Sequence, residues 1–150
     1  MAGKAKAGSG GKVAEAQFRR HLPIIDGDSQ GFWEGCREGE LRLQRCRACG
    51  RFRYAPKRIC PNCLSDDFEW RAVSGRGKVY TFSVEHHAYH PAWKEDIPYA
   101  VAVVELEEGP RMTSRIIGCD AGEVRIGLPV RVAFEKVTEE ITLPLFTPGE

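Results

Sequence analysis

Cys46-Arg-Ala-Cys49, ten intervening residues and Cys60-Pro-Asn-Cys63 form the stretch that decides the fold of this chain. Two C-x-x-C pairs at this separation are the ligand pattern of a tetrahedral zinc site with four cysteine ligands. Gly50 suits the left-handed turn that follows such a pair, and Pro61 stiffens the second turn. Because four sulfurs close the coordination shell, we predict one structural Zn2+ per chain, with no position for water or substrate. Two disulfides or a redox-active pair are the alternative interpretations.

Short alternating stretches on both sides of the cysteines predict the strands of a zinc ribbon. Residues 41–44 alternate apolar and polar side chains before the first pair, and residues 52–55 continue the same period after it. Residues 69–73 lead away from the second pair. We therefore expect a ribbon of about three short strands over residues 41–69.

The residues before the ribbon predict a tail and two short helices. Residues 1–12 contain little to bury and are expected to be a disordered tail. Residues 13–21 suit a marginal helix, and residues 29–38 suit a second helix that Gly39 is placed to end. We expect residues 13–40 to dock on a partner, because they carry more apolar side chains than a small ribbon can cover. These side chains are Phe18, Leu22, Ile24, Ile25, Phe32 and Trp33.

The sequence pattern after residue 73 is typical of an all-β domain. Five short stretches separated by turn signals predict five strands, and a longer connection over residues 118–129 follows the third. This order suits a small Greek-key barrel of the oligonucleotide/oligosaccharide-binding (OB) type, with a small sandwich as the alternative. We assign the barrel to residues 70–146 and a tail to residues 147–150. The predicted fold class is mainly β: an N-terminal helical segment, a rubredoxin-like zinc ribbon with four cysteine ligands and a five-stranded OB barrel.

The composition is that of a globular protein. Hydrophobic residues make up 42% and charged residues 29% of the chain, which excludes the fibrous and disordered classes. No apolar run approaches the roughly 20 residues that a membrane helix needs. The basic N-terminus is not followed by an apolar segment, so it does not resemble a secretory signal. We expect a reducing, cytoplasmic compartment, in which the cysteines are thiolates rather than disulfides.

The charges are distributed unevenly along the chain. Residues 64–150 hold nine Lys and Arg against fifteen Asp and Glu, whereas residues 41–65 hold seven Lys and Arg and no carboxylate. Such a basic block suits phosphate groups, and a solvated basic face is the alternative.

Several motifs occur in an order that resembles a known family. The motifs are Phe32-Trp-Glu-Gly35, Leu41-Arg-Leu-Gln-Arg-Cys-Arg-Ala-Cys-Gly50, Cys60-Pro-Asn-Cys63, Val73-Ser-Gly-Arg-Gly-Lys-Val-Tyr80, Glu105-Leu-Glu-Glu-Gly-Pro110, Ile117-Gly-Cys-Asp120, Ile126-Gly-Leu-Pro-Val130 and Leu143-Pro-Leu-Phe146. Over roughly residues 22–146 the chain is similar to the small acyl-CoA-associated accessory proteins that join a helical segment, a zinc ribbon and an OB domain.

The resemblance implies an accessory role beside a catalytic subunit of the thiolase type. Members of this family bind thiolases or thiolase-like enzymes and help to shape the channel for CoA thioesters. The zinc ligands correspond to Cys46, Cys49, Cys60 and Cys63, and no catalytic residue carries over. We expect residues 13–38 to dock on a dimeric thiolase-fold subunit and give a heterotetramer. Benzoylsuccinyl-CoA-type thiolases of anaerobic aromatic degradation are one candidate for the complex.

Two groups of residues are predicted to face the thioester. Coenzyme A carries a 3′-phosphate and a pyrophosphate, and the planar guanidinium of arginine suits phosphate oxygens. The arginines expected at the mouth of the channel are Arg47, Arg51, Arg53 and Arg58. A loop rich in histidine and aromatic residues is expected nearer the acyl end, and its residues are His86, His87, Tyr89, His90 and Trp93.

Other functions are compatible with the sequence alone. His86, His87 and His90 could bind a second metal if a helix placed them on one face. Pro91 and the preceding strand disfavour such a helix. Cys119 is a nucleophile only if a base lies beside it, and the sequence identifies none. OB domains and zinc ribbons also bind single-stranded nucleic acid, although the barrel is the acidic part of this chain. A stand-alone enzyme built on the histidine loop is the third alternative.

Overall fold

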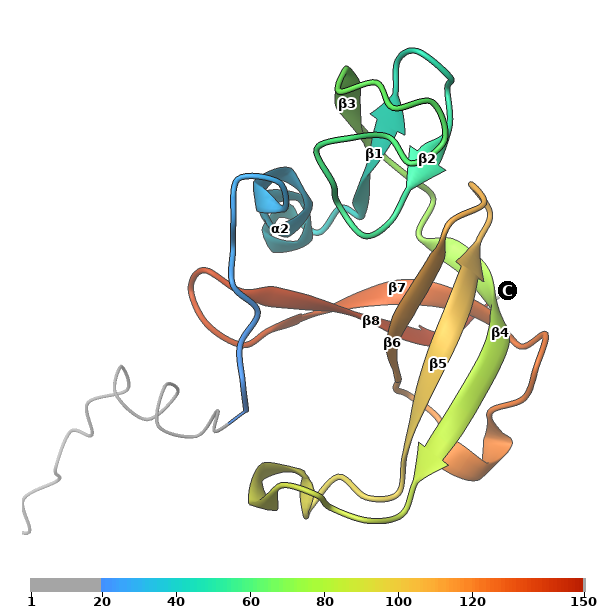
Figure 1. Ribbon diagram of the computed structural model, residues 1–150. Helices are drawn as coiled ribbons and strands as arrows, with labels where there is room; N and C mark the ends of the chain where they lie inside the picture. Colours follow the sequence, from blue (N-terminus) through green and yellow to red (C-terminus); the bar gives the residue numbers. More distant parts are fainter. Residues whose placement is uncertain (1–19, 150) are drawn as a thin grey trace, which may run out of the picture.

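The computed structural model describes residues 20–149, in which one α-helix, a small antiparallel sheet and a closed β-barrel follow one another along the chain (Figure 1). Of the helix predicted over residues 13–21, residues 13–19, including Phe18, lie outside the described residues, and residues 20 and 21 are not helical. Within residues 20–149 no helix combines the length and apolar character needed to cross a membrane. The mainly β fold predicted from the sequence is confirmed.

Helix α2 (Gln30–Glu38) begins after a compact turn. The Ser29 hydroxyl donates to Asp26 Oδ1 at 2.6 Å, and the Ser29 N–H donates to the same atom at 2.8 Å. Ser29 occupies the N-cap position, but its side chain forms no capping bond to the helix. At the other end Gly39 takes a φ of 80°, a left-handed conformation that glycine adopts without strain and that ends the helix.

The zinc ribbon is a three-stranded antiparallel sheet. Its strands are β1 (Arg42–Cys46), β2 (Phe52–Arg53) and β3 (Phe68–Ala72), and β1 lies between the other two. Along β1 the side chains of Leu43, Gln44 and Cys46 are buried. Cys46 is therefore the last residue of the central strand, and Cys49 lies in the turn that follows it.

The barrel is closed by five strands in the order β4-β5-β6-β8-β7. All pairs are antiparallel except β6 and β8, which run parallel, and this arrangement confirms the predicted OB barrel rather than a sandwich. The last strand continues past the predicted domain end at residue 146. The strands are β4 (Arg76–Glu85), β5 (Tyr99–Leu106), β6 (Arg111–Ile116), β7 (Pro129–Lys136) and β8 (Thr142–Pro148).

Two single turns of 3-10 helix interrupt the barrel connections. One is η1 (Pro91–Trp93), in the loop between β4 and β5. The other is η2 (Ala121–Glu123), in the longer connection after β6.

Helix α2 packs against both the ribbon and the β7–β8 hairpin (Figure 1). Phe32 is 3% exposed and its ring lies 5.6 Å from that of Tyr54. The expectation that Phe32 faces a partner is therefore wrong, because this side chain fills a core shared by ribbon, helix and barrel. Trp33 packs against the same core. By contrast Leu22, Ile24 and Ile25, which precede the helix, remain exposed.

Candidate functional site

The four cysteines of the two C-x-x-C pairs converge on one point. Their sulfur atoms all lie within 4.8 Å of one another, with Cys46 Sγ 3.5 Å from Cys63 Sγ and Cys49 Sγ 3.7 Å from Cys60 Sγ. Zinc–sulfur bonds of about 2.3 Å in a tetrahedron give a sulfur–sulfur separation of about 3.8 Å. A disulfide needs about 2.05 Å, and all four cysteines are free, so the interpretation as two disulfides is wrong. The residues fit a structural Zn2+, as predicted.

The two halves of the site are built alike. The carbonyl of Cys46 accepts from Gly50 N–H at 2.8 Å, and the carbonyl of Cys60 accepts from Leu64 N–H at 2.9 Å. Gly50 has a φ of 74° and Leu64 a φ of 62°, so the same left-handed turn closes each half. The sequence indicated the first turn through Gly50 and the second through Pro61. It carried no signal for the left-handed Leu64, a conformation that non-glycine residues seldom adopt.

Backbone N–H groups adjust the acidity of the sulfurs. Hydrogen bonds from the N–H groups of Cys63 and Asn62 lower the pKa of the Cys60 thiol to about 6. The Ser65 N–H lowers the pKa of the Cys63 thiol. The sulfurs of Cys46, Cys49 and Cys60, together with desolvation, outweigh this effect, and the net pKa is raised to about 12. Four sulfurs this close cannot all ionise unless a cation shares them, and Zn2+ supplies that charge.

One of the four arginines predicted to meet phosphate is part of the ribbon interior. Arg53 is 7% exposed; its Nε donates to Gln44 Oε1 at 2.7 Å and a terminal nitrogen donates to the Lys57 carbonyl at 2.8 Å. Lys57 N–H also donates to Gln44 Oε1, at 2.9 Å. Arg53 therefore holds β2 and the following loop to β1 and does not reach the surface.

The other three arginines lie at the surface, but they differ in their partners. Arg47 forms ion pairs with Asp67 at 3.3 Å and Glu69 at 3.8 Å. Arg51 and Arg58 are exposed and form no ion pair within residues 20–149. Arg51 also lines a cleft of about 500 Å3 between the ribbon and the β5–β6 hairpin. Folding thus leaves Arg51 and Arg58 as the available cations of this group.

The histidine-rich loop lies beside the N-terminal segment. His90 Nδ1 accepts from Ala92 N–H at 3.1 Å, and the His90 ring lies 6.2 Å from that of His21. Tyr89 is 84% exposed and its ring contacts His87 at 4.9 Å between centroids. The three histidines of the loop do not converge on a metal site, because the cysteine cluster is the one possible metal site within residues 20–149.

A shallow groove follows the outer face of β4, β5 and β6 next to this loop. Its volume is about 480 Å3, and Tyr89 and Tyr99 lie at the end nearest the loop. Among the described residues Glu85 is the one ionic group that lines it, and its carboxylate accepts from the Ser83 hydroxyl at 2.9 Å. In OB folds this strand face, with its adjoining loops, is where ligands bind. The sequence predicted the strands but not the groove, whose floor is formed by Thr81, Val101, Val103 and Thr113.

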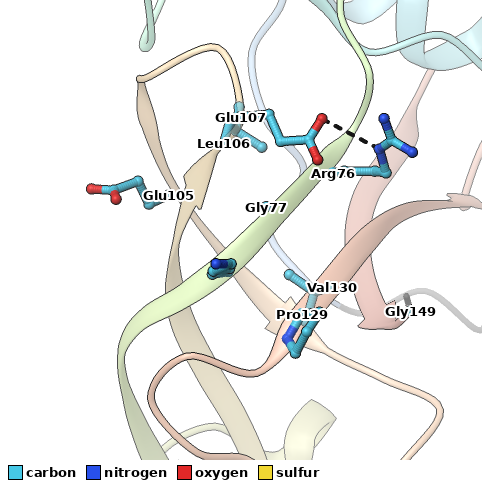
Figure 2. Close-up of a pocket in the computed structure, with 9 residues that line it drawn as sticks. Arg76, Gly77, Glu105, Leu106, Glu107, Pro129, Val130 and Gly149 are labelled. Atoms are coloured by element: carbon cyan, nitrogen blue, oxygen red, sulfur yellow. Dashed lines mark hydrogen bonds and ion pairs between the residues drawn. The ribbon is translucent and has the colours of Figure 1, made fainter.

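A second cavity, of about 560 Å3, lies where β4 meets β7 (Figure 2). Arg76 pairs with Glu107 at 3.3 Å across it. The lining also contains Lys78 and Glu105, so the two cations and two carboxylates that residues 20–149 contribute cancel. This cavity offers no excess positive charge for a phosphate.

Comparison with known proteins identifies the same two modules. Residues 33–69 match the family model described as "ChsH2, rubredoxin-like zinc ribbon domain", and residues 70–135 match "ChsH2, C-terminal OB-fold domain". The solved structure described as "Ltp2-ChsH2(DUF35) aldolase" superposes with a TM-score of 0.76 at 38% identity, covering 85% of this chain and 98% of that chain. A "DUF35 domain-containing scaffold protein" of Methanocaldococcus jannaschii is 40% identical over 97 residues, which are 64% of this chain and 68% of the relative. The chain belongs to the DUF35 family. The resemblance seen in the sequence is thereby confirmed.

Other relatives of this DUF35 protein are subunits of acyl-CoA enzymes. It is 38% identical over 130 residues to a "Probable enoyl-CoA hydratase alpha subunit" of Thermomonospora curvata, covering 87% of this chain but only 40% of that relative. It is 35% identical over 99 residues to "Benzoylsuccinyl-CoA thiolase subunit BbsA" of Geobacter metallireducens, covering 61% of this chain and 64% of BbsA. The names of these relatives thus refer to three kinds of enzyme: a hydratase, an aldolase and a thiolase.

Proposed function

We propose that this DUF35 protein is a non-catalytic scaffold subunit of a thiolase-type acyl-CoA enzyme, supporting its activity and helping to form the acyl-CoA channel. The observation that carries this proposal is the closed zinc shell. All four ligands are cysteines, so the metal offers no open position for chemistry.

The remaining reactive groups support a non-catalytic role. Burial, followed by the carboxylates of Glu123 and Asp120, raises the pKa of the Cys119 thiol, so the thiol stays protonated and weakly nucleophilic at neutral pH. Burial raises the pKa of Cys36 to about 12. Neither thiol is the activated nucleophile that acyl transfer requires.

The partner surface is proposed on the segment before α2. Leu22, Ile24 and Ile25 are exposed, and Ile24 reaches 88% exposure. Apolar side chains grouped in this way commonly mark a surface that another protein covers. We propose that they dock on a dimeric thiolase-fold subunit to give a heterotetramer. The BbsA relative favours a thiolase, while hydratase and aldolase partners are the competing outcomes.

The thioester is proposed to lie across the ribbon and the barrel. Two exposed arginines of the ribbon, Arg51 and Arg58, form no ion pair within residues 20–149 and suit the phosphates of coenzyme A. The groove of β4–β6 and the loop with Tyr89 suit an apolar or aromatic acyl group, which is consistent with a benzoylsuccinyl-CoA-type substrate. The same groove disfavours single-stranded nucleic acid, because the one ionic group that lines it within residues 20–149 is a carboxylate.

Co-purification from the native host with point variants tests the proposal. Ile24→Asp places a charge on the proposed docking surface and should abolish co-purification with a thiolase-fold subunit while leaving one zinc per chain. Ile126→Asp is the matched control, since Ile126 is 69% exposed on the barrel and outside the docking segment. If Ile24→Asp retains the partner and Ile126→Asp loses it, the docking surface is elsewhere. A hydratase or aldolase as the captured subunit would replace the thiolase assignment.

A further inference from the structure

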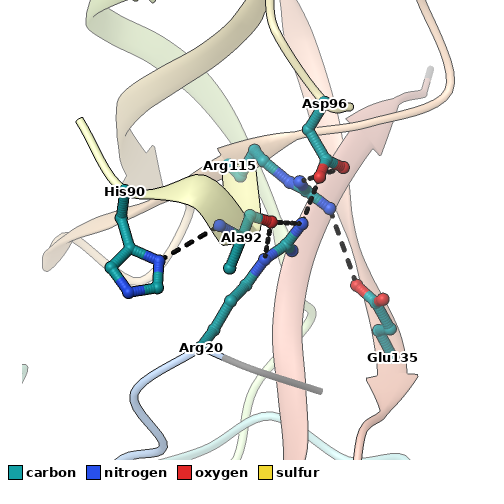
Figure 3. Close-up of polar contacts among 6 residues, drawn as sticks. All are labelled: Arg20, His90, Ala92, Asp96, Arg115 and Glu135. Atoms are coloured by element: carbon teal, nitrogen blue, oxygen red, sulfur yellow. Dashed lines mark hydrogen bonds and ion pairs between the residues drawn. The ribbon is translucent and has the colours of Figure 1, made fainter. Parts of the chain in front are cut away.

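Arg20, at the start of the described chain, reaches into the loop between β4 and β5 (Figure 3). Its Nε and one terminal nitrogen donate to the Ala92 carbonyl at 3.3 and 3.2 Å, and the same terminal nitrogen pairs with Asp96. The guanidinium also lies over the Trp93 ring, 3.8 Å from its centroid. One side chain thus contacts three residues of a loop that lies far along the sequence.

The barrel holds the same loop from another side through Arg115 on β6. Arg115 pairs with Asp96 at 3.2 Å and with Glu135 of β7 at 3.7 Å (Figure 3). Its guanidinium also lies 5.5 Å from the centroid of the Trp93 ring. The side chains of Arg20 and Arg115 are only 18% and 16% exposed. Ion pairs and cation–π contacts gain strength when water is excluded in this way. Asp96 is therefore shared by two largely buried arginines.

The clamp formed by Arg20, Arg115, Trp93 and Asp96 continues into the groove. The Trp93 ring lies 5.0 Å from the ring of Tyr99, which lines the end of the groove nearest the loop. Within the loop the N–H groups of Ala92, Trp93 and Asp96 are hydrogen-bonded to His90 or Trp93, so the turn has a defined shape. A contiguous set of contacts runs from Arg20 through Trp93 to the wall of the groove.

We propose that Arg20 is a positioning residue that ties the docking segment to the groove, so that a catalytic subunit bound at Leu22–Ile25 also fixes the wall against which an acyl group lies. This proposal deepens the proposed function and rests on it. The docking segment and the groove wall both contact the loop between β4 and β5, so the conformation of this loop affects both. By linkage, a thioester that favours this conformation tightens binding of the partner, and the partner tightens binding of the thioester by the same factor.

Hydrogen exchange of the full chain alone tests the contact, with no partner needed. In Arg20→Gln, amides of Ala92, Trp93 and Asp96 should exchange about tenfold faster, because the clamp is lost while the barrel remains closed. Arg111→Gln is the matched control. Arg111 also combines an ion pair, to Glu105 at 2.9 Å, with a cation–π contact, to Tyr80 at 3.5 Å, but it lies outside the loop.

Loop exchange that is unchanged in Arg20→Gln, or that rises equally in Arg111→Gln, overturns the proposal. Asp96→Asn serves as a second variant, because it removes the carboxylate from the loop side and should produce the same acceleration. In the reconstituted complex, a non-hydrolysable acyl-CoA analogue should tighten partner binding to the wild-type chain and lose this effect in Arg20→Gln. A chain that passes the exchange test but never captures a catalytic subunit would leave the clamp standing and refute the proposed function.

Discussion

At the scale of single residues, Cys60 has two properties of a metal ligand. Its sulfur lies 3.7 Å from the Cys49 sulfur, and the pKa of its thiol is lowered. Cys60→Ser should lose zinc and soluble protein together, because a small ribbon folds only around its metal. Metal analysis of the purified chain measures the change. Cys119→Ser is the control and should keep one zinc per chain, since Cys119 lies outside the cluster. A soluble, folded Cys60→Ser protein with full zinc content would contradict the assignment.

Arg53 and Arg51 look equivalent in the sequence but differ in burial. Arg53→Ala should lower the free energy of unfolding by about 2 kcal/mol, because it removes one donor to the buried Gln44 side chain and the side-chain donor to the Lys57 carbonyl. Arg51→Ala, at an exposed position, should change it by less than about 0.5 kcal/mol. Urea denaturation of the zinc-loaded chains measures both. If both variants change the free energy of unfolding equally, the hydrogen bonds of the buried Arg53 side chain do not contribute to stability.

These residues also show which parts of the site the sequence could supply. The four ligands follow from spacing alone, because a C-x-x-C pair fixes both sulfurs on one turn. The burial of Arg53 does not follow, since it depends on Gln44 being covered by the chain after β2. The left-handed Leu64 does not follow from the sequence either, because Pro61 marks the turn but no glycine marks the position with positive φ.

At the scale of elements, helix α2 lies close to the ribbon because of its glycines. A Cβ on Gly31 would stand 2.4 Å from the Trp70 indole, and one on Gly35 would stand 2.8 Å from the Glu40 carbonyl oxygen. Both separations are shorter than contacts that real Cβ atoms make. The glycines therefore set how near the helix approaches β3 and the start of β1.

Gly31→Ala should destabilise the chain although alanine is the better helix former. The gain in helix propensity is about 1 kcal/mol, whereas forcing the Trp70 indole aside costs roughly 1–3 kcal/mol. We expect a net loss of about 1 kcal/mol, measured by thermal or urea unfolding. Gly122→Ala is the control, because nothing lies within 4 Å of a Cβ placed there. A stabilised Gly31→Ala protein would mean that the helix shifts away without loss.

Element positions were largely predictable, but their environments were not. Alternation and turn residues placed the ribbon and barrel strands, because period two is imposed by the pleat of a half-buried sheet. The apolar stripe of α2 was also visible, yet a stripe does not say what covers it. Phe32 was expected at a partner interface and is instead covered by the ribbon and barrel of the same chain.

At the scale of the whole molecule, folding rearranges the charge pattern seen along the sequence. The carboxylate-free block of residues 41–65 meets Asp67 and Glu69 in space, and both pair with Arg47. The exposed cations of the block that form no ion pair within residues 20–149 are Arg51, Lys57 and Arg58, two of them arginines. The sequence could supply the sign of the charge on the ribbon, but only the fold distinguishes paired cations from available ones.

The double variant Arg51→Glu/Arg58→Glu should weaken binding of the thioester more than it slows the chemistry. Each arginine that contacts a coenzyme A phosphate makes a charge-assisted hydrogen bond, so losing such contacts should raise KM for acyl-CoA at least about tenfold in the reconstituted complex. The value of kcat should change less, because phosphates far from the reacting carbon are bound equally in ground and transition states. Steady-state kinetics with an acyl-CoA and with the matching short thioester that lacks the nucleotide separates the two effects.

Arg125→Glu is the control for net charge, since Arg125 is exposed on the barrel and forms no ion pair within residues 20–149. It should leave KM for acyl-CoA unchanged, and the short thioester should be insensitive to all of these changes. If KM for acyl-CoA rises equally in Arg125→Glu, the effect of the double variant comes from long-range electrostatics and not from contacts of Arg51 and Arg58 with the phosphates. If the isolated wild-type chain instead holds single-stranded DNA at micromolar affinity with a steep salt dependence, the two arginines serve a nucleic acid, because that dependence reports phosphates neutralised along a strand.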